Sequence, residues 1–114
     1  MKIINKTKNI VLAEEAGVAD NPFRRIKGLL GKKGLNRGEA LVIRPCNSIH
    51  TFFMRFPIDV LFVSKDNRVV KAISCLKSFR LSAVYFSASF VIELPSGVIQ
   101  STSTQEGDSI SLQY

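Results

Sequence analysis

The residues best suited to chemistry lie in one stretch, residues 49–63, which reads I-H-T-F-F-M-R-F-P-I-D-V-L-F-V. It contains the only histidine of the chain, His50, together with Arg55 and Asp59 among apolar side chains. Histidine titrates near neutral pH and can serve as a base, a proton donor or a metal ligand. A carboxylate such as Asp59 is costly to bury unless it is paired or accepts several hydrogen bonds. The stretch is therefore the first candidate for a functional site.

Two interpretations of this stretch remain open. In the structural one, Asp59 accepts backbone N–H groups or pairs with Arg55, and so fixes the bend that Pro57 introduces. In the functional one, a pocket for a small ligand is lined by the candidate ligand-binding residues His50, Phe52, Met54, Arg55 and Asp59. We favour a non-enzymatic ligand-binding or accessory domain that serves a small ligand or a protein assembly, because these residues form one polar and aromatic group without a credible catalytic set.

A catalytic alternative is a small hydrolase or transferase that uses His50 with Cys46 or Asp59. Cys46 precedes His50 by four residues, a spacing that neither supports nor excludes a nucleophilic pair. A metal held by Cys46, His50 and Cys75 is disfavoured, because zinc motifs normally show paired close ligands. The sequence implies no metal and no cofactor, and we rank the enzyme below the binding domain.

Basic residues form a candidate anion patch in the N-terminal third of the chain. The formal net charge is +7, and residues 1–38 hold nine Lys and Arg against three acids. Such a patch is suited to binding nucleic acid or another anionic partner. We rank nucleic-acid binding third, because aromatic residues for base stacking are not interleaved with the charges. The patch consists of Arg24, Arg25, Lys27, Lys32, Lys33 and Arg37.

The composition is that of one soluble globular domain, residues 1–114, with 46% apolar and 22% charged residues. The longest uncharged stretch, residues 81–92, is shorter than the roughly 20 apolar residues of a membrane-spanning helix. The N-terminal sequence M-K-I-I-N-K-T-K lacks the apolar region of a secretory signal, so we expect a cytoplasmic location. In a reducing cytosol, Cys46 and Cys75 are expected to be free, buried thiols.

Short strands joined by turns must position these residues. Alternation and turn residues predict a hairpin at Asp66-Asn67 and strands over residues 3–8, 9–18, 39–43, 84–94 and 110–113. The apolar residues from His50 to Val63 are almost continuous, which indicates an extended segment with little solvent on either face.

Two short helices complete the expected elements. Asp20-Asn21-Pro22 predicts the start of a helix that runs to about Leu30, with its core-facing residues being Phe23, Ile26 and Leu30. A second helix is predicted within residues 96–105. Together the elements indicate an α+β fold, mainly antiparallel, arranged as a compact and partly closed β-barrel-like domain.

The order of the motifs also resembles a known family. The chain carries, in turn, F-R-R-I-K-G-L-L-G, G-E-A-L-V-I, the stretch over residues 49–63 with its hairpin, V-I-E-L-P-S-G and E-G-D-S-I. Over about residues 8–113 this order is similar to domain-of-unknown-function family 192, also called uncharacterised protein family 0127. Many members of that family carry Trp and Asn-Thr where this chain has Phe53 and Phe56-Pro57, and many begin with an export or lipid-anchor signal. The resemblance implies a compact β-rich domain and transfers no activity.

Overall fold

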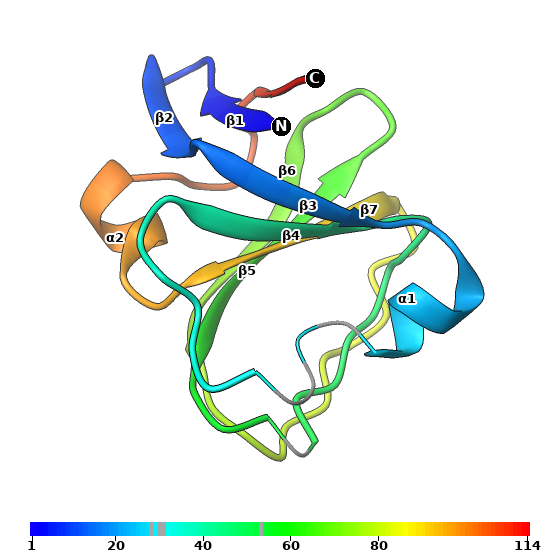
Figure 1. Ribbon diagram of the computed structural model, residues 1–114. Coiled ribbons are helices and arrows are strands. Elements are labelled where there is room, and N and C mark those ends of the chain that lie inside the picture. The colour runs from blue at the N-terminus through cyan, green and yellow to red at the C-terminus, as the bar shows by residue number, and fades with distance from the viewer. Residues whose placement is uncertain (28, 30–31, 53) are drawn as a thin grey trace.

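Strands dominate the computed structural model, which describes residues 1–27, 29, 32–52 and 54–114 (Figure 1). The strands are β1 (Lys2–Asn5), β2 (Ile10–Ala13), β3 (Glu15–Ala19), β4 (Glu39–Ile43), β5 (Ile58–Ser64), β6 (Val69–Leu76), β7 (Ala88–Pro95) and β8 (Ile110–Gln113). The helices are α1 (Pro22–Lys27) and α2 (Val98–Thr102). The predicted strands at 39–43 and 110–113 and the hairpin at Asp66-Asn67 are confirmed.

The strands form two sheets. The smaller has the order β2-β1-β8, and the larger has the order β3-β4-β7-β5-β6. Neighbouring strands are antiparallel except β3 and β4, which are parallel. In Figure 1 the small sheet lies at the top and long loops descend from the large sheet. A small, mainly antiparallel α+β domain is therefore confirmed, whereas the described strands do not close into the expected barrel.

The predicted strand over residues 9–18 is in fact two strands in different sheets. β2 ends at Ala13 in the small sheet, and β3 begins at Glu15 in the large one. At the junction the Gly38 carbonyl accepts the N–H groups of both Glu14 and Glu15 at 2.9 Å. These bonds turn the chain from one sheet into the other. Gly38 itself has φ +91, a conformation that suits glycine.

The large sheet buries side chains on both faces, as the continuous apolar run of β5 indicates. One face packs against the small sheet, and we call it the small-sheet face; it includes Leu61, Ile92 and Leu94. The other is covered by loops, and we call it the loop face; it includes Val60 and Val91. Strand alternation therefore decides which of the two environments each side chain enters.

The first helix begins where the sequence predicts it, because the Asn21 side chain accepts the Arg24 N–H at 2.8 Å. It ends at Lys27, earlier than expected. Phe23 is 75% exposed, so the prediction that it faces the core is wrong. Leu30 and the side chain of Ile26 lie outside the described residues. Among the residues described, no helix has the length and apolar composition to cross a membrane.

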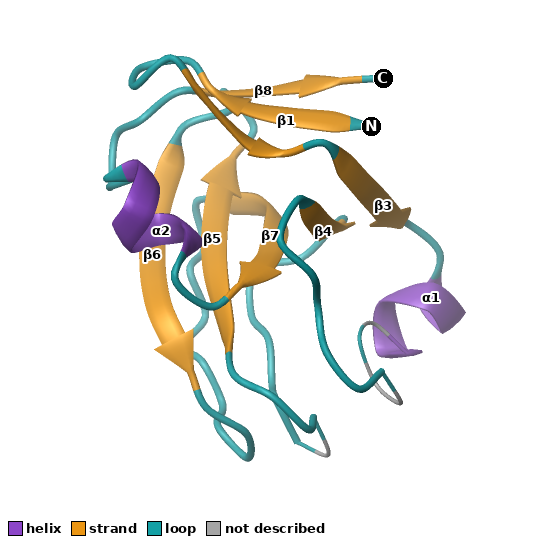
Figure 2. Cartoon of the chain, turned by 60° about the vertical axis from the view of Figure 1, so that its left-hand side comes forward, coloured by secondary structure: helices purple, strands orange, loops and turns teal. Residues whose placement is uncertain are grey.

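Two of the segments that cover the loop face are residues 46–57 and 77–87, and we call them the loop pair. They run alongside each other, with Ser82 N–H donating to the Ile49 carbonyl and Tyr85 N–H donating to the Asn47 carbonyl, both at 2.9 Å. Figure 2 shows this pair extending below the sheet. The expected extended segment from His50 to Val63 is thus mostly loop, and its strand begins only at Ile58.

Candidate functional site

Asp59 is a structural tie at the centre of the fold. Its side chain is fully buried on the small-sheet face, opposite Leu94. Oδ1 accepts the Cys75 N–H at 2.8 Å, and Oδ2 accepts the N–H groups of Gly97 at 3.1 Å and Ile99 at 2.8 Å. The carboxylate therefore joins β5 to the end of β6 and to the start of α2. Of the two partners considered for a structural Asp59, backbone N–H groups or Arg55, the structure therefore has the backbone N–H groups.

The other alternative, a pairing of Asp59 with Arg55, does not occur, because Arg55 is exposed while Asp59 is fully buried and accepts backbone N–H groups. His50 is also exposed, and its ring stacks on Phe52 with centroids 5.4 Å apart. Met54 is 6% exposed and packs in the core of the loop face. Within the described part of the chain, the five candidate ligand-binding residues are thus divided between the surface and two separate cores.

The thiol of Cys46 is poorly suited to nucleophilic attack. It is half-buried and donates to the Ser48 carbonyl at 3.1 Å. Burial raises the pKa of Cys46, the Glu93 charge adds to this, and the Ser48 bond and the Arg25 charge oppose it. Reactive cysteines have the opposite shift. Both cysteines are free as predicted, although Cys75 is exposed rather than buried.

Thr51 organises the loop pair, and sequence reasoning missed it. Its side chain is fully buried, and its hydroxyl donates to the Lys77 carbonyl at 2.6 Å and accepts the Arg80 N–H at 2.9 Å. Its backbone N–H donates to the Arg80 carbonyl at 2.9 Å, and its carbonyl accepts the Phe79 N–H at 3.1 Å. One small residue therefore fixes the relative position of both loops.

Replacing Thr51 with valine tests this role. We expect a loss of about 1–2 kcal/mol in the free energy of unfolding, because valine keeps the shape but leaves the Arg80 N–H without its acceptor. Urea denaturation measures the loss. Thr7→Val serves as a control, because the Thr7 hydroxyl also accepts a backbone N–H, that of Ser109, but at an exposed turn. An equal effect of both substitutions would contradict the role of Thr51.

Glu93 is the most unusual polar residue of the described chain. It lies on β7 and is only 4% exposed, and its Oε2 has no hydrogen-bond partner among the residues that the structure describes. Burial raises the pKa of Glu93 to about 7. Buried polar atoms nearly always have partners, and perturbed carboxyl groups are typical of functional sites. Glu93 is thus a candidate site residue that was not predicted from the sequence.

The surroundings of Glu93 connect it to the central motif. Its neighbours across the sheet are Leu41 on β4 and Val60 on β5, which places its side chain on the loop face. Leu41 and Val60 belong to the same apolar cluster as Met54 and Phe56 of the motif. The motif therefore covers the sheet face on which this carboxyl is buried.

A pocket of about 480 Å³ opens beside Cys46 at the same side of the sheet. Its lining residues combine polar groups of the loop with the start of β7, namely Arg25, Pro45, Cys46, Asn47, Ser48, Ala88 and Ser89. Ser89 and Glu93 lie on one face of β7 by strand alternation. Cys46 lies in the pocket wall, and the charge of Glu93 contributes to the raised pKa of its thiol. The pocket and the buried carboxyl therefore lie on the same face of the large sheet.

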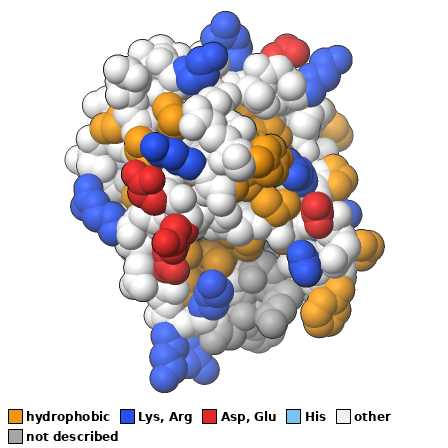
Figure 3. Space-filling model, turned by 45° about the horizontal axis from the view of Figure 1, so that its top comes forward, with side chains coloured by type: hydrophobic (Ala, Val, Ile, Leu, Met, Phe, Trp, Pro, Cys, Tyr) orange, Lys and Arg blue, Asp and Glu red, His pale blue; other side chains and the backbone are white. Residues whose placement is uncertain are grey.

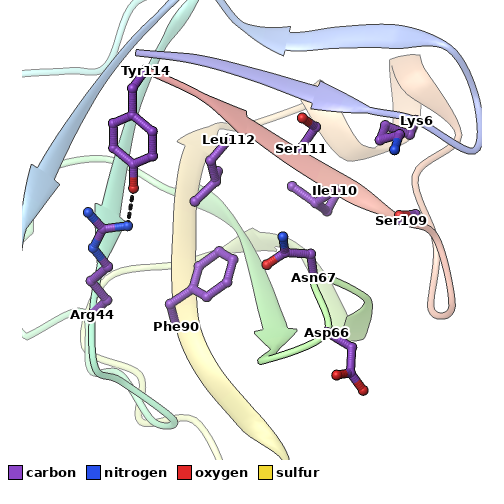
Figure 4. A pocket seen from close by; sticks show the side chains of 10 residues that line it. All are labelled: Lys6, Arg44, Asp66, Asn67, Phe90, Ser109, Ile110, Ser111, Leu112 and Tyr114. Carbon is purple, nitrogen blue, oxygen red and sulfur yellow. Dashed lines mark hydrogen bonds between the residues drawn. The ribbon is translucent and has the colours of Figure 1, made fainter.

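A second pocket of about 480 Å³ lies between β8 and the β5–β6 turn (Figure 4). Its floor includes Phe90 and Leu112, and Figure 4 shows the Arg44 side chain bonded to the Tyr114 hydroxyl at one end. The Arg44 guanidinium carbon is also 5.5 Å from the centroid of the Tyr114 ring. Because its arginine already has a partner in the chain, this pocket offers a weaker indication of a ligand than Glu93 does.

The anion patch is placed on α1 and on the loop that follows it. Arg24 and Arg25 are exposed on the helix, and Lys32, Lys33 and Arg37 are exposed in the loop. The side chain of Lys27 lies outside the described residues. Within the described ranges, no three His, Cys, Asp or Glu side chains gather into a group that could hold a metal ion.

Comparisons with known proteins agree with this fold. Residues 3–112 match the model of the DUF192 family, described as "Uncharacterized ACR". UPF0127 proteins of Thermococcus kodakarensis and Pyrococcus horikoshii are each 35% identical over 113 residues; the matches cover 96% and 95% of this chain and 71% and 96% of those proteins.

Two crystal structures have a similar fold. A protein of unknown function from Novosphingobium aromaticivorans has a TM-score of 0.86 at 18% identity, covering 98% of this chain and 84% of that one. A putative transcription regulator from Sinorhizobium meliloti has a TM-score of 0.80 at 15% identity, covering 96% and 89%. At such identities the likeness concerns the fold alone.

Proposed function

This chain belongs to the DUF192 family, which is described as "Uncharacterized ACR", and we propose that it is a non-enzymatic domain that binds a small ligand beside Glu93. The observation that carries the proposal is the Glu93 carboxyl, buried with an Oε2 that lacks a partner among the described residues. Leaving such an atom unsatisfied costs about 1–3 kcal/mol. A ligand group that donates a hydrogen bond would remove this cost.

The chemistry around Glu93 favours a small amine with an apolar skeleton. Leu41, Val60 and Met54 supply apolar surface on the loop face. With a pKa of about 7, the carboxyl is partly ionised at neutral pH, and a bound ammonium group would favour its charged form. The pocket beside Cys46 includes Ser89, which shares a face of β7 with Glu93, and it supports access from that side.

Binding is favoured over catalysis by the separation of the candidate catalytic groups. Asp59 is held by three backbone donors on the small-sheet face, away from His50 on the loop pair. The Cys46 thiol has a raised pKa, which disfavours the nucleophilic thiolate. A buried carboxyl in an apolar setting without a nucleophile suits recognition of a ligand.

Ligand-observed NMR with small alkylamines and the alcohols of the same shape tests this function. We expect the amines to bind the wild-type protein and to bind Glu93→Gln at least about tenfold more weakly, because the charge-assisted hydrogen bond is lost. Amine affinity should also rise between pH 6 and pH 8, roughly as Glu93 with its pKa of about 7 loses its proton.

The matched control is Glu15→Gln, which removes an exposed carboxylate on β3 and should bind the amines like the wild type. Equal amine binding by the wild type and Glu93→Gln would sink the proposal. So would an affinity that does not change with pH across this range.

A further inference from the structure

The lower end of the loop pair exposes large apolar side chains. Phe52 is 39% exposed, Phe79 61% and Leu81 70%. They are held close together, because His50 stacks on Phe52 and forms a bridge with Leu81, while the Phe79 N–H donates to the Thr51 carbonyl. Clustered exposed apolar groups on a surface are typical of interaction sites.

The charged residues at the same end are all positive. Arg55, Lys77 and Arg80 are all exposed, and residues 46–57 and 77–87 contain neither Asp nor Glu. We call the loop tip the set made of Phe52, Arg55, Lys77, Phe79, Arg80 and Leu81. By contrast, Figure 3 shows acidic and basic side chains interspersed on the upper face of the molecule. The loop tip is therefore both apolar and cationic, and its partner should be anionic.

The loop tip is also preformed. Thr51 is fully buried beneath it and ties its own loop to the carbonyls of Lys77 and Arg80. In addition, the Ser78 hydroxyl donates to the Met54 carbonyl at 2.7 Å. These bonds hold described backbone of the two loops in place, which lowers the entropy cost of docking and so favours binding.

We propose that the loop tip docks this domain on an anionic lipid surface. Arg55, Lys77 and Arg80 would meet the lipid phosphates and carboxylates, while Phe79 and Leu81 enter the boundary between headgroups and acyl chains. Single-stranded nucleic acid is the competing anionic partner, and it binds through rings that stack on bases. Leu81, the most exposed apolar residue of the tip, has no ring, which favours lipid.

Cosedimentation with vesicles of phosphatidylcholine, with and without phosphatidylserine, tests the inference. We expect the wild-type chain to bind only the vesicles that contain phosphatidylserine, and binding should weaken as salt is raised. Phe79→Ser/Leu81→Ser and Lys77→Ala/Arg80→Ala should each lower the partition coefficient by at least about tenfold. Circular dichroism and urea denaturation establish that each variant is folded.

The matched controls lie at the opposite end of the molecule. Ile10→Ser/Val11→Ser removes two apolar residues that are each 37% exposed on β2, and Lys6→Ala/Lys65→Ala removes two exposed lysines. Both should bind vesicles like the wild type. Vesicle binding that ignores phosphatidylserine, or that the tip and control variants lower equally, would overturn the inference. Binding to single-stranded oligonucleotides without binding to vesicles would overturn it in favour of nucleic acid.

This inference and the proposed function can fail separately. Glu93 lies under the loops and is 4% exposed, whereas every residue of the loop tip is exposed. Glu93→Gln should therefore leave vesicle binding unchanged, and the tip variants should leave amine binding unchanged.

Discussion

Replacement of Asp59 by alanine is expected to lower the free energy of unfolding by about 3–5 kcal/mol. The carboxylate accepts the N–H groups of Cys75, Gly97 and Ile99, and each donor left unsatisfied in a buried site costs about 1–3 kcal/mol. Water that enters the space left by the side chain would recover part of this cost. Small domains have total stabilities of about 5–15 kcal/mol, so the variant should be close to unfolding.

Urea denaturation measures this loss, and Asp59→Asn is the milder variant if alanine prevents folding. Asparagine retains one oxygen acceptor but turns an N–H₂ group toward at least one backbone donor, so we expect a loss of about 2 kcal/mol. Asp66→Ala, in the exposed turn between β5 and β6, should change stability by less than about 0.5 kcal/mol. A loss below about 1 kcal/mol for Asp59→Ala would show that the tie is dispensable.

The second large effect concerns Glu93 and pH. Burial raises the pKa of Glu93 from 4.5 to about 7, so the folded protein holds this proton more tightly than the unfolded chain does. The free energy of unfolding of the wild type should therefore fall as pH rises from about 4.5 to about 7 and then level off. The full loss is about 3 kcal/mol. The glutamine of the Glu93→Gln variant cannot ionise, so the free energy of unfolding of this variant should not show that loss.

The measurement is the difference in unfolding free energy between Glu93→Gln and the wild type at pH 4.5 and at pH 8. We expect this difference to shift by about 3 kcal/mol in favour of the variant at the higher pH. Glu15→Gln, at an exposed position, should show a much smaller shift. A pH profile of Glu93→Gln parallel to that of the wild type would show that the carboxyl is solvated in the folded protein.

Local signals predicted the elements better than their assembly. The turn at Asp66-Asn67 and the cap at Asn21 depend on a few neighbouring residues, and both occur in the structure. The break at Glu14 could not be predicted in the same way, because the Gly38 carbonyl that accepts two N–H groups there is distant in sequence. The exposure of Phe23 likewise depends on where α1 meets the rest of the chain.

The candidate site was predicted only in part. The reasoning that a carboxylate in an apolar run must have an uncommon environment drew attention to Asp59, which is buried and accepts three backbone N–H groups. It applies equally to Glu93, which stands in the run V-I-E-L of β7, and this was the available signal that was missed. The sequence could not distinguish the two, because the difference lies in their partners: Asp59 has three backbone donors, and Glu93 Oε2 has none among the described residues.

The pairing of β1 with β8 has a consequence for the order of folding. Lys2 pairs with Gln113, and Asn5 pairs with Ile110, so this sheet joins segments from the two ends of the 114-residue chain. Loop-closure entropy opposes such distant contacts until the intervening chain has folded. The β5–β6 hairpin needs only a short turn and should form early. During synthesis the other strands can pair before β8 has been made. Until then, the edge of β1 that pairs with β8 in the folded protein remains unpaired.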